Sequence, residues 1–218
     1  MKRLGLTGRQ IFVKRLFDIT FSIVGLLLTS WLILIAFILA SIETKSNGFF
    51  IQTRVGRAGQ QFKIFKIKTM RTIKNYNTVV TTSKDPRITR TGKIFRKAKI
   101  DELPQLLNIL LGHMSFVGPR PDVPGFADQL TNQDDKVILQ VRPGITGLAT
   151  LYYRDEEDIL SKVDNPELYN KTVIFPNKIK INRYYIENYS IYLDVKCIFF
   201  TIFGGGKSLI PKDLNLLE

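Results

Sequence analysis

Lys99-Ile100-Asp101-Glu102-Leu103-Pro104-Gln105 places two carboxylates side by side at the start of a predicted helix. The leucines of this helix recur at helical spacing and form one apolar stripe, made of Leu103, Leu106, Leu107, Leu110 and Leu111. Pro104 is tolerated in a first helical turn, where its missing N–H group breaks no helical hydrogen bond, and Gly112 is a typical C-terminal stop. The spacing therefore predicts a helix over residues 103–111, with Asp101 at or next to its N-cap.

The surroundings of Asp101 are strongly basic. Three cations lie just upstream, namely Arg96, Lys97 and Lys99. These cations and the N–H groups of a helix start would stabilise a carboxylate over the neutral acid, and they would also attract phosphate. One interpretation is that Asp101 only caps the helix. A functional site is favoured by the neighbouring Glu102, by the cations and by Arg120, whose backbone is held stiff between two prolines.

The charge is distributed unevenly along the 218 residues. The formal net charge is +13, but residues 1–100 carry 20 Lys and Arg against 3 Asp and Glu, whereas residues 101–218 carry 12 against 16. A basic half of this kind indicates an anionic partner such as lipid headgroups, nucleotides or nucleic acid. The single cysteine, Cys197, excludes an internal disulfide, and the single histidine, His113, excludes a His-rich metal site.

Residues 16–42 form an almost entirely apolar run. The run exceeds the roughly 20 residues that a helix needs to cross the hydrocarbon core, and it is too long for a cleaved signal peptide. Because basic residues flank both ends, the positive-inside rule places both ends in the cytoplasm, which suits a helix that enters the bilayer, bends and returns. Thr29 and Ser30, in the middle of the run, carry hydroxyls that could serve backbone groups freed by a bend. Charge alone leaves this re-entrant helix and a plain single-pass helix equally open.

A β-hairpin is predicted directly after this run. Residues 49–53 and 61–69 are rich in Phe and Ile, and Gly56 and Gly59 fall between them. Lysines alternate with the apolar side chains of the second strand. Beside a membrane segment, this alternation favours contact with anionic lipid or phosphate over contact with nucleic acid.

The rest of the chain is predicted to be mostly helical. Residues 94–98 suggest a short basic helix, and residues 126–141 and 178–189 suggest two longer ones. The amphipathic, Phe-rich segment 191–203 is either a core helix or a helix that lies in a bilayer interface. The acidic run at 155–158 lacks metal-ligand spacing and is interpreted as a solvated face.

Five motifs follow one another in order between residues 14 and 147. They are Lys14-Arg15-Leu16-Phe17-Asp18, Phe65-Lys66-Ile67-Lys68-Thr69-Met70, Asp101-Glu102-Leu103-Pro104-Gln105, Val117-Gly118-Pro119-Arg120-Pro121 and Arg142-Pro143-Gly144-Ile145-Thr146-Gly147. In this order they resemble the bacterial sugar transferase family, the monotopic polyprenyl-phosphate phosphoglycosyl transferases. Trp31 departs from the pattern, since many members have a helix-breaking proline there.

The resemblance implies a membrane phosphotransferase of surface polysaccharide or glycoconjugate synthesis. A UDP-sugar donor gives its sugar-1-phosphate to polyprenyl (undecaprenyl) phosphate, and UMP leaves. Asp101 would be the nucleophile, forming a phosphosugar-aspartyl intermediate, and Glu102 would bind Mg²⁺ on the diphosphate. The residues that match the family's phosphate-binding cations are Lys66, Arg96, Arg120 and, more weakly, Arg142. An anionic nucleophile that approaches an anionic diphosphate needs such cations and a metal.

The resemblance also implies the fold and the location. We expect an α+β, mostly helical chain with a basic N-terminus and a re-entrant membrane helix at 1–46. A catalytic domain at 47–203, with a small hairpin and interfacial amphipathic helices, and a C-terminal tail at 204–218 would follow. The protein would sit in the bacterial inner membrane, in contact with lipid, with its catalytic domain facing the cytoplasm.

Two other classes account for part of the sequence. A non-enzymatic basic membrane adaptor would explain the apolar run and the basic half, but not the adjacent carboxylates among cations. A membrane protein that binds nucleic acid would explain the charge and the aromatic residues, yet the sequence carries no recognised nucleic-acid motif. We therefore expect no nucleic-acid partner.

Overall fold

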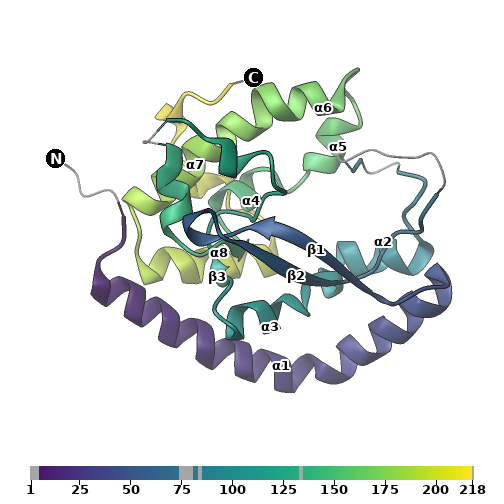
Figure 1. Ribbon diagram of the computed structural model, residues 1–218. Coiled ribbons are helices and arrows are strands. Elements are labelled where there is room, and N and C mark those ends of the chain that lie inside the picture. The colour runs from purple at the N-terminus through teal and green to yellow at the C-terminus, as the bar shows by residue number, and fades with distance from the viewer. Residues whose placement is uncertain (1–4, 74–80, 83–84, 133–134, 218) are drawn as a thin grey trace.

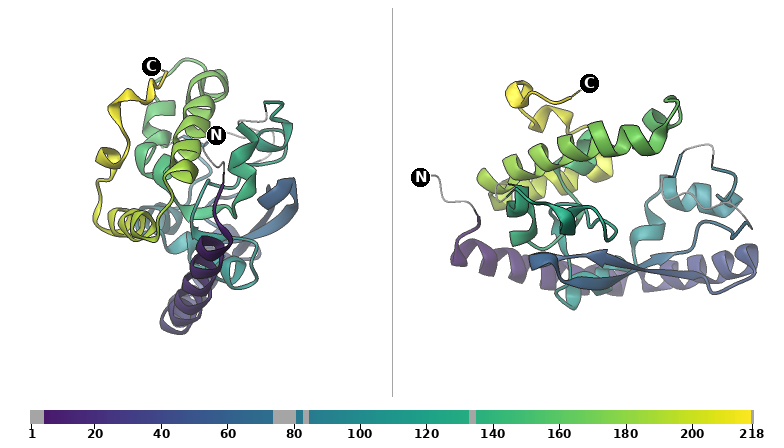
Figure 2. Two further views of the ribbon diagram at one scale, coloured as in Figure 1. Left: turned by 90° about the vertical axis from the view of Figure 1, so that its left-hand side faces the viewer. Right: turned by 45° about the horizontal axis from the view of Figure 1, so that its top comes forward.

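Helix α1 (Gly8–Thr44) runs along the base of the molecule and carries the rest of the chain on one side (Figures 1 and 2). The structure is a computed structural model that describes residues 5–73, 81–82, 85–132 and 135–217. Residues 1–4 of the predicted N-terminal segment lie outside the described part. The described residues are mostly helical and include the small hairpin sheet, as predicted, together with a second two-stranded sheet that was not predicted.

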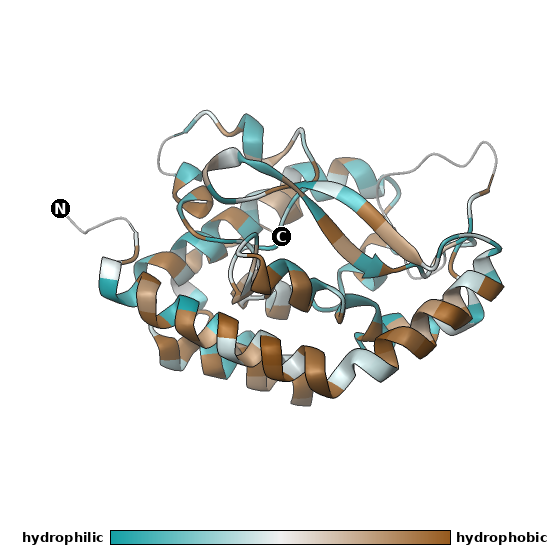
Figure 3. Cartoon of the chain, turned by 60° about the horizontal axis from the view of Figure 1, so that its bottom comes forward, coloured by the Kyte–Doolittle hydropathy of each residue, from teal (hydrophilic) through white to brown (hydrophobic). Residues whose placement is uncertain are grey.

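Helix α1 is one continuous helix of 37 residues. It begins at a capping box formed by Thr7 and Gln10, and it ends at Lys45, which has a left-handed φ of 51°. By length and composition it is apolar enough to cross a membrane. Its middle exposes large apolar side chains, such as Leu27 at 74% and Trp31 at 62%. In Figure 3 most of the ribbon of this helix has the brown colour of hydrophobic residues. In Figure 1 the helix bows, and both of its ends turn toward the domain.

The Lys14–Asp18 motif attaches the start of α1 to the domain. The Lys14 ammonium donates to Asp194 Oδ2 at 2.5 Å. Arg15 donates to the carbonyl oxygens at the end of α3 (Gln105–Leu110), and Asp18 accepts from the hydroxyl of Ser115 at 3.0 Å. The motif thus joins α1 to three separate segments of the chain.

The end of α1 contacts the same domain. The Glu43 carboxylate accepts from the backbone N–H groups at the start of α2 (Arg90–Lys97), which is the predicted short basic helix. Ala36 and Ala40 pack with Ile67 and Phe95 in a small apolar cluster. Both ends of the helix are therefore fixed to one folded unit.

The predicted hairpin is confirmed. Strands β1 (Phe49–Val55) and β2 (Gln61–Ile67) pair antiparallel, and the turn Arg57–Gly59 joins them. Asn108 of α3 fixes β2 from one side, because its Oδ1 accepts from Phe65 N at 3.0 Å and its Nδ2 donates to Lys63 O at 2.8 Å.

The helix start at Asp101 differs from the prediction. Residues Ile100–Glu102 form a 3₁₀ turn that follows Lys99, a residue with a left-handed φ of 57°. Pro104 is the N-cap of α3, so Asp101 does not cap it. Gly112, with φ +85°, ends the helix as predicted.

Two glycine-containing motifs pack against each other through their backbones. Strand β3 (Ser115–Val117) leads into the motif at 117–121, and strand β4 (Gly144–Thr146) lies within the motif at 142–147. The two strands pair in parallel. A Cβ on Gly144 would lie 2.2 Å from the backbone N of Gly118, and one on Gly147 would lie 2.4 Å from Gly118 O. Only glycine permits this approach, which fixes the chain that leads into Arg120.

The second half contributes the main core. Its helices are α4 (Leu148–Tyr152), α5 (Glu156–Leu160), α6 (Pro166–Tyr169), α7 (Phe175–Glu187) and α8 (Ile191–Phe203), with a π-helical turn at Asn170–Ile174. The predictions for α7 and α8 are confirmed. The predicted helix at 126–141 is wrong, since Ala127–Gln129 and Asp135–Gln140 are separate 3₁₀ turns and Leu130 between them is extended.

The predicted C-terminal tail packs back on the domain. Gly204, Gly205 and Gly206 all have positive φ and turn the chain, after which Ile210 joins the main core. The side-chain amide of Asn177 in α7 donates from Nδ2 to Leu217 O at 2.8 Å, and its Oδ1 accepts from Leu217 N at 2.7 Å.

Candidate active site

Glu102 lies at the centre of a buried ion cluster drawn from three elements. Its Oε1 accepts from Lys66 Nζ of β2 at 3.0 Å and from Arg120 Nη2, beyond β3, at 2.8 Å. The Glu102 side chain is 8% exposed. The structure thus brings together three of the predicted site residues from positions that are distant in sequence.

The charges of this cluster depend on one another. Burial acts to raise the pKa of Glu102, but Arg120 and Lys66 hold it well below its usual range. Burial lowers the pKa of Lys66, although Glu102 opposes that shift. The Glu102 carboxylate raises the pKa of Arg120, so the cluster holds one carboxylate between two cations.

Asp101 is buried beside this cluster without a full set of partners. The residue is 7% exposed, and its Oδ1 has no hydrogen-bond partner. Burial and the neighbouring Glu102 raise the pKa of Asp101, against the pull of Lys66, Arg96 and Lys99. The predicted cations do act to favour the ionised carboxylate, but burial outweighs them. The predicted helix-end N–H groups do not contribute at Oδ1, because the 3₁₀ turn buries this oxygen without giving it a donor.

Arg96 lies near enough to Asp101 for its charge to lower the pKa of that carboxyl, and it forms an ion pair with a residue of α5. Its Nη2 forms an ion pair with Glu157, and Glu156 of the same short helix pairs with Lys178 at 2.7 Å. The acidic run at 155–158 is therefore not only a solvated face. These partners lie 61 and 22 residues apart, so no local pattern could have shown them.

Asp122 is a site residue that the sequence reasoning missed. It follows the Arg120 motif and lies within electrostatic range of Arg54, Arg120 and Lys178. Burial raises the pKa of Asp122 to about 6, although these cations oppose the shift. The only sequence signal was its position next to Pro121.

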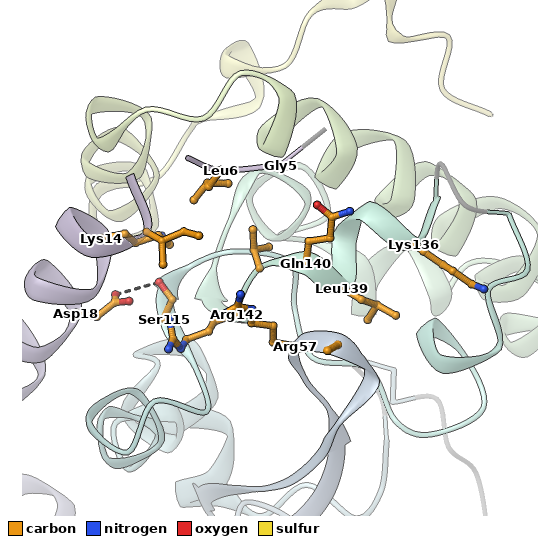
Figure 4. A pocket seen from close by; sticks show the side chains of 13 residues that line it. Gly5, Leu6, Lys14, Asp18, Arg57, Ser115, Lys136, Leu139, Gln140 and Arg142 are labelled. Atoms are coloured by element: carbon orange, nitrogen blue, oxygen red, sulfur yellow. Dashed lines mark hydrogen bonds between the residues drawn. The ribbon is translucent and has the colours of Figure 1, made fainter. Parts of the chain in front are cut away.

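Arg142 does not join this cluster. Its Nε donates to Gly112 O at 2.8 Å, and its side chain lines a separate cavity with Arg57 and Lys14 (Figure 4). The other predicted cations, Lys66, Arg96 and Arg120, act on the two carboxylates.

The carboxylates fit a metal that a substrate helps to hold. Within the described residues, no group of three or more His, Cys, Asp or Glu side chains converges on one point, so there is no protein-only cage. Mg²⁺ commonly binds through one or two carboxylates together with substrate phosphates. Both ion pairs of Glu102 use Oε1, which leaves Oε2 outside them, and Asp101 Oδ1 is unpartnered.

The family described as "Bacterial sugar transferase" matches residues 9–207 of this chain. The chain belongs to the bacterial sugar transferase family. The match spans α1, the hairpin, the carboxylate cluster and all helices of the second half.

Curated relatives of this sugar transferase come from several bacteria. The UDP-glucose:undecaprenyl-phosphate glucose-1-phosphate transferase of Klebsiella pneumoniae is 37% identical over 92% of this chain and 41% of its own length. The UDP-N-acetylgalactosamine-undecaprenyl-phosphate N-acetylgalactosaminephosphotransferase of Aeromonas hydrophila is 34% identical over 88% of this chain and 43% of its own length. The chain thus spans less than half of these two proteins.

A third relative matches nearly end to end. The exopolysaccharide production protein PSS of Rhizobium leguminosarum bv. phaseoli is 36% identical over 88% of this chain and 94% of its own length.

Proposed function

We propose that this sugar transferase moves sugar-1-phosphate from a UDP-sugar to a polyprenyl phosphate at a membrane surface, and releases UMP. The observation that carries the proposal is the buried Asp101 carboxylate with an unpartnered oxygen, next to a Glu102 that is fixed between Lys66 and Arg120. The names of the relatives support the donor and acceptor classes. The product would enter surface polysaccharide synthesis, as the name of the Rhizobium relative suggests.

The reaction would proceed in two displacements at one phosphorus. A carboxylate oxygen of Asp101 attacks the phosphorus that bears the sugar, and the bond from that phosphorus to the bridging oxygen breaks, so UMP leaves with the oxygen. A phosphate oxygen of the polyprenyl acceptor then attacks the same phosphorus. The bond to Asp101 breaks, the carboxylate is restored, and a polyprenyl diphosphate sugar forms.

The surrounding side chains would manage charge. Asp101 must be ionised to attack, and its raised pKa makes it a better nucleophile once it is deprotonated. Lys66, Arg96 and Arg120 would neutralise the diphosphate oxygens as the substrate approaches. Glu102 would hold Mg²⁺ through Oε2, the oxygen that neither ion pair uses, and the ion, when bound, would supply charge neutralisation at the diphosphate.

The attachment of α1 supports a re-entrant orientation. A 37-residue helix is about 55 Å long, enough to cross a bilayer. A crossing helix would leave its two ends on opposite sides. Here Lys14 and Glu43, near the two ends, both bond to the same domain. We propose that the exposed apolar middle of α1 enters one leaflet and that both ends face the cytoplasm.

Two experiments test these proposals separately. Purified full-length protein in detergent, mixed with polyprenyl phosphate and a panel of UDP-sugars, should release UMP with at least one donor. No release with any donor would favour the non-enzymatic adaptor.

Orientation is tested in intact cells with Gly8→Cys and Asn47→Cys, while the native Cys197 is buried. Both positions should be protected from an impermeant thiol reagent until the cells are opened. Labelling of one position from outside would show that α1 crosses the membrane.

A further inference from the structure

The cavity that Arg142 lines has a volume of about 600 Å³ and lies apart from the carboxylate cluster. It is enclosed by the start of α1, the turn between β1 and β2, the 3₁₀ turn Asp135–Gln140 and the segment that leads into β4 (Figure 4). None of Lys66, Arg96, Asp101, Glu102 or Arg120 lines it. A ligand held here would therefore not contact the proposed reacting groups.

Two of the charged residues in this cavity are already satisfied. Lys14 pairs with Asp194, and Asp18 accepts from Ser115 Oγ and Phe116 N, both at 3.0 Å. Their charges and hydrogen bonds are used to attach α1 to the domain. In the described part of the chain, neither carboxylate forms an ion pair with Arg57 or Arg142.

The guanidinium groups of Arg57 and Arg142 form the positive side of the cavity. Within the described residues, neither makes an ion pair. Arg15 lies close to Arg142, because Arg142 Nε donates to Gly112 O and a Cβ on Gly112 would lie 3.4 Å from Arg15 Nη2. The same Nη2 of Arg15 donates to Leu110 O. Burial, Arg15 and Arg57 lower the pKa of Arg142, and Asp18 is the carboxylate that opposes them. Figure 4 shows Arg142 between the Asp18–Ser115 hydrogen bond and Arg57, whereas Lys136 points away at the far edge.

The position of the cavity indicates how a ligand would reach it. Leu6 and Ile11 give the cavity an apolar side beside α1. Phe12 and Leu16, on the same turns of α1 as the lining residue Ile11 but on another face, are 69% and 57% exposed, so this part of the helix also offers apolar surface. A phosphate with an attached acyl tail fits this combination, because the head would meet the guanidinium groups and the tail would follow the helix.

We propose that this cavity binds the phosphate of an anionic membrane lipid, with Arg57 and Arg142 as its ligands. The bound headgroup would link the hairpin turn, the start of α1 and the β4 segment at the membrane surface. The inference needs α1 to lie at a bilayer, but it does not depend on the proposed transfer reaction.

A direct binding assay tests the proposal without turnover. The full-length protein in a neutral detergent is titrated by calorimetry with short-chain phosphatidylglycerol, with inorganic phosphate and with the matching diacylglycerol, which has the tails but no phosphate. The parent should bind one equivalent of phosphatidylglycerol, inorganic phosphate more weakly, and diacylglycerol not measurably.

The variants identify the ligands. Arg57→Gln changes an exposed turn residue and should weaken phosphatidylglycerol binding by about tenfold or more, since a charged hydrogen bond is lost. Arg142→Lys keeps the charge but loses the planar fork, and should also weaken binding. The matched control is Lys162→Gln with Lys171→Gln, which removes two exposed charges that follow α5 and α6 in the chain and should leave binding unchanged. Figure 1 shows α5 and α6 on the side of the domain that lies away from α1.

Three results would contradict the proposal. Parental affinity for phosphatidylglycerol in Arg57→Gln would overturn the site, because the proposal makes Arg57 a ligand of the headgroup phosphate. Equal binding of diacylglycerol would show that only the tails are recognised. Equal affinity for inorganic phosphate, with the same dependence on Arg57, would show that the ligand is free phosphate and that the lipid assignment is wrong.

Discussion

Two buried lysine–carboxylate pairs lie in the described part of the chain, and they differ in how completely hydrogen-bond partners satisfy their surroundings. In the first, Asp194 accepts from Lys14 at 2.5 Å and from the Tyr185 hydroxyl at 2.6 Å, and it is 1% exposed. In the second, Glu102 accepts from Lys66 and Arg120, but the adjacent Asp101 is buried with an oxygen that has no partner.

The difference separates structural roles from chemical ones. A buried polar network whose members are all satisfied rigidifies a fold, and the Lys14–Asp194 pair joins α1 to α7 and α8 in this way. A buried carboxylate with an oxygen that lacks a hydrogen-bond partner costs stability unless a ligand supplies that partner. The first cluster should therefore control stability and the second activity.

The largest expected effect is on activity, at Asp101. Asp101→Asn should lower kcat for UMP release by more than about 10³-fold, because the amide cannot form the phosphoryl bond. It removes a buried charge with an unpartnered oxygen, so the melting temperature should not fall. A variant that turns over near the parental rate, or one that loses activity only because it unfolds, would break the comparison.

The next effect is on stability, at Asp194. Asp194→Asn leaves Lys14 buried without its counter-charge and should cost about 3–5 kcal/mol, roughly a 10 °C fall in melting temperature in detergent. The double variant Lys14→Met with Asp194→Leu removes both charges and should recover most of that loss. A single variant as stable as the parent would show that this cluster does not hold α1 in place.

A smaller effect is expected at Glu102. Glu102→Gln should lower turnover by about 10²-fold, and its residual activity should depend more steeply on Mg²⁺ concentration than that of the parent. Initial rates of UMP release across a Mg²⁺ series give both quantities. An unchanged Mg²⁺ dependence would restrict Glu102 to holding Lys66 and Arg120 in position.

The smallest effect is a pH dependence at Asp122. Its folded-state pKa, about 6, exceeds the unfolded value near 3.9, so the folded protein binds this proton more tightly. The stability gained is complete below about pH 4 and is lost as the pH rises through 6. The free energy of unfolding of Asp122→Asn should therefore match that of the parent near pH 4 and exceed it by up to about 2 kcal/mol at pH 7.5.

Melting temperatures of the two proteins from pH 4 to 8 measure this divergence, with Asp158→Asn, an exposed change of the same charge, as the control. A difference between Asp122→Asn and the parent that stays constant with pH would rule out the assignment.

Elements with strong periodicity were predictable from sequence. The hairpin followed from its Phe- and Ile-rich strands and Gly56 and Gly59, and α8 followed from its apolar run. The local structure at Asp101 was not predictable, because it depends on Lys99 adopting a left-handed conformation that non-glycine residues rarely take. The segment 126–141 was also mispredicted, since its buried residues Val137 and Ile138 reach the core from a 3₁₀ turn.

The site was predictable as a list of residues but not as an arrangement. The motifs named Asp101, Glu102, Lys66 and Arg120, and the structure brings these four together. The place of Arg142 depends on the backbone packing of Gly144 against Gly118, a tertiary contact that the motif does not reveal. The pairing of Asn108 with β2, which sets the position of Lys66, depends in the same way on long-range contacts.

The most direct test of the role of Asp101 is the intact mass of the protein after incubation with a donor UDP-sugar in the absence of acceptor. We expect the parent to gain the mass of one sugar phosphate, with the label mapped by peptide fragmentation to Asp101 and lost when polyprenyl phosphate is added. Asp101→Asn should gain nothing. A stable adduct on another residue, or transfer to the acceptor by Asp101→Asn, would contradict the assignment of this carboxylate as the nucleophile.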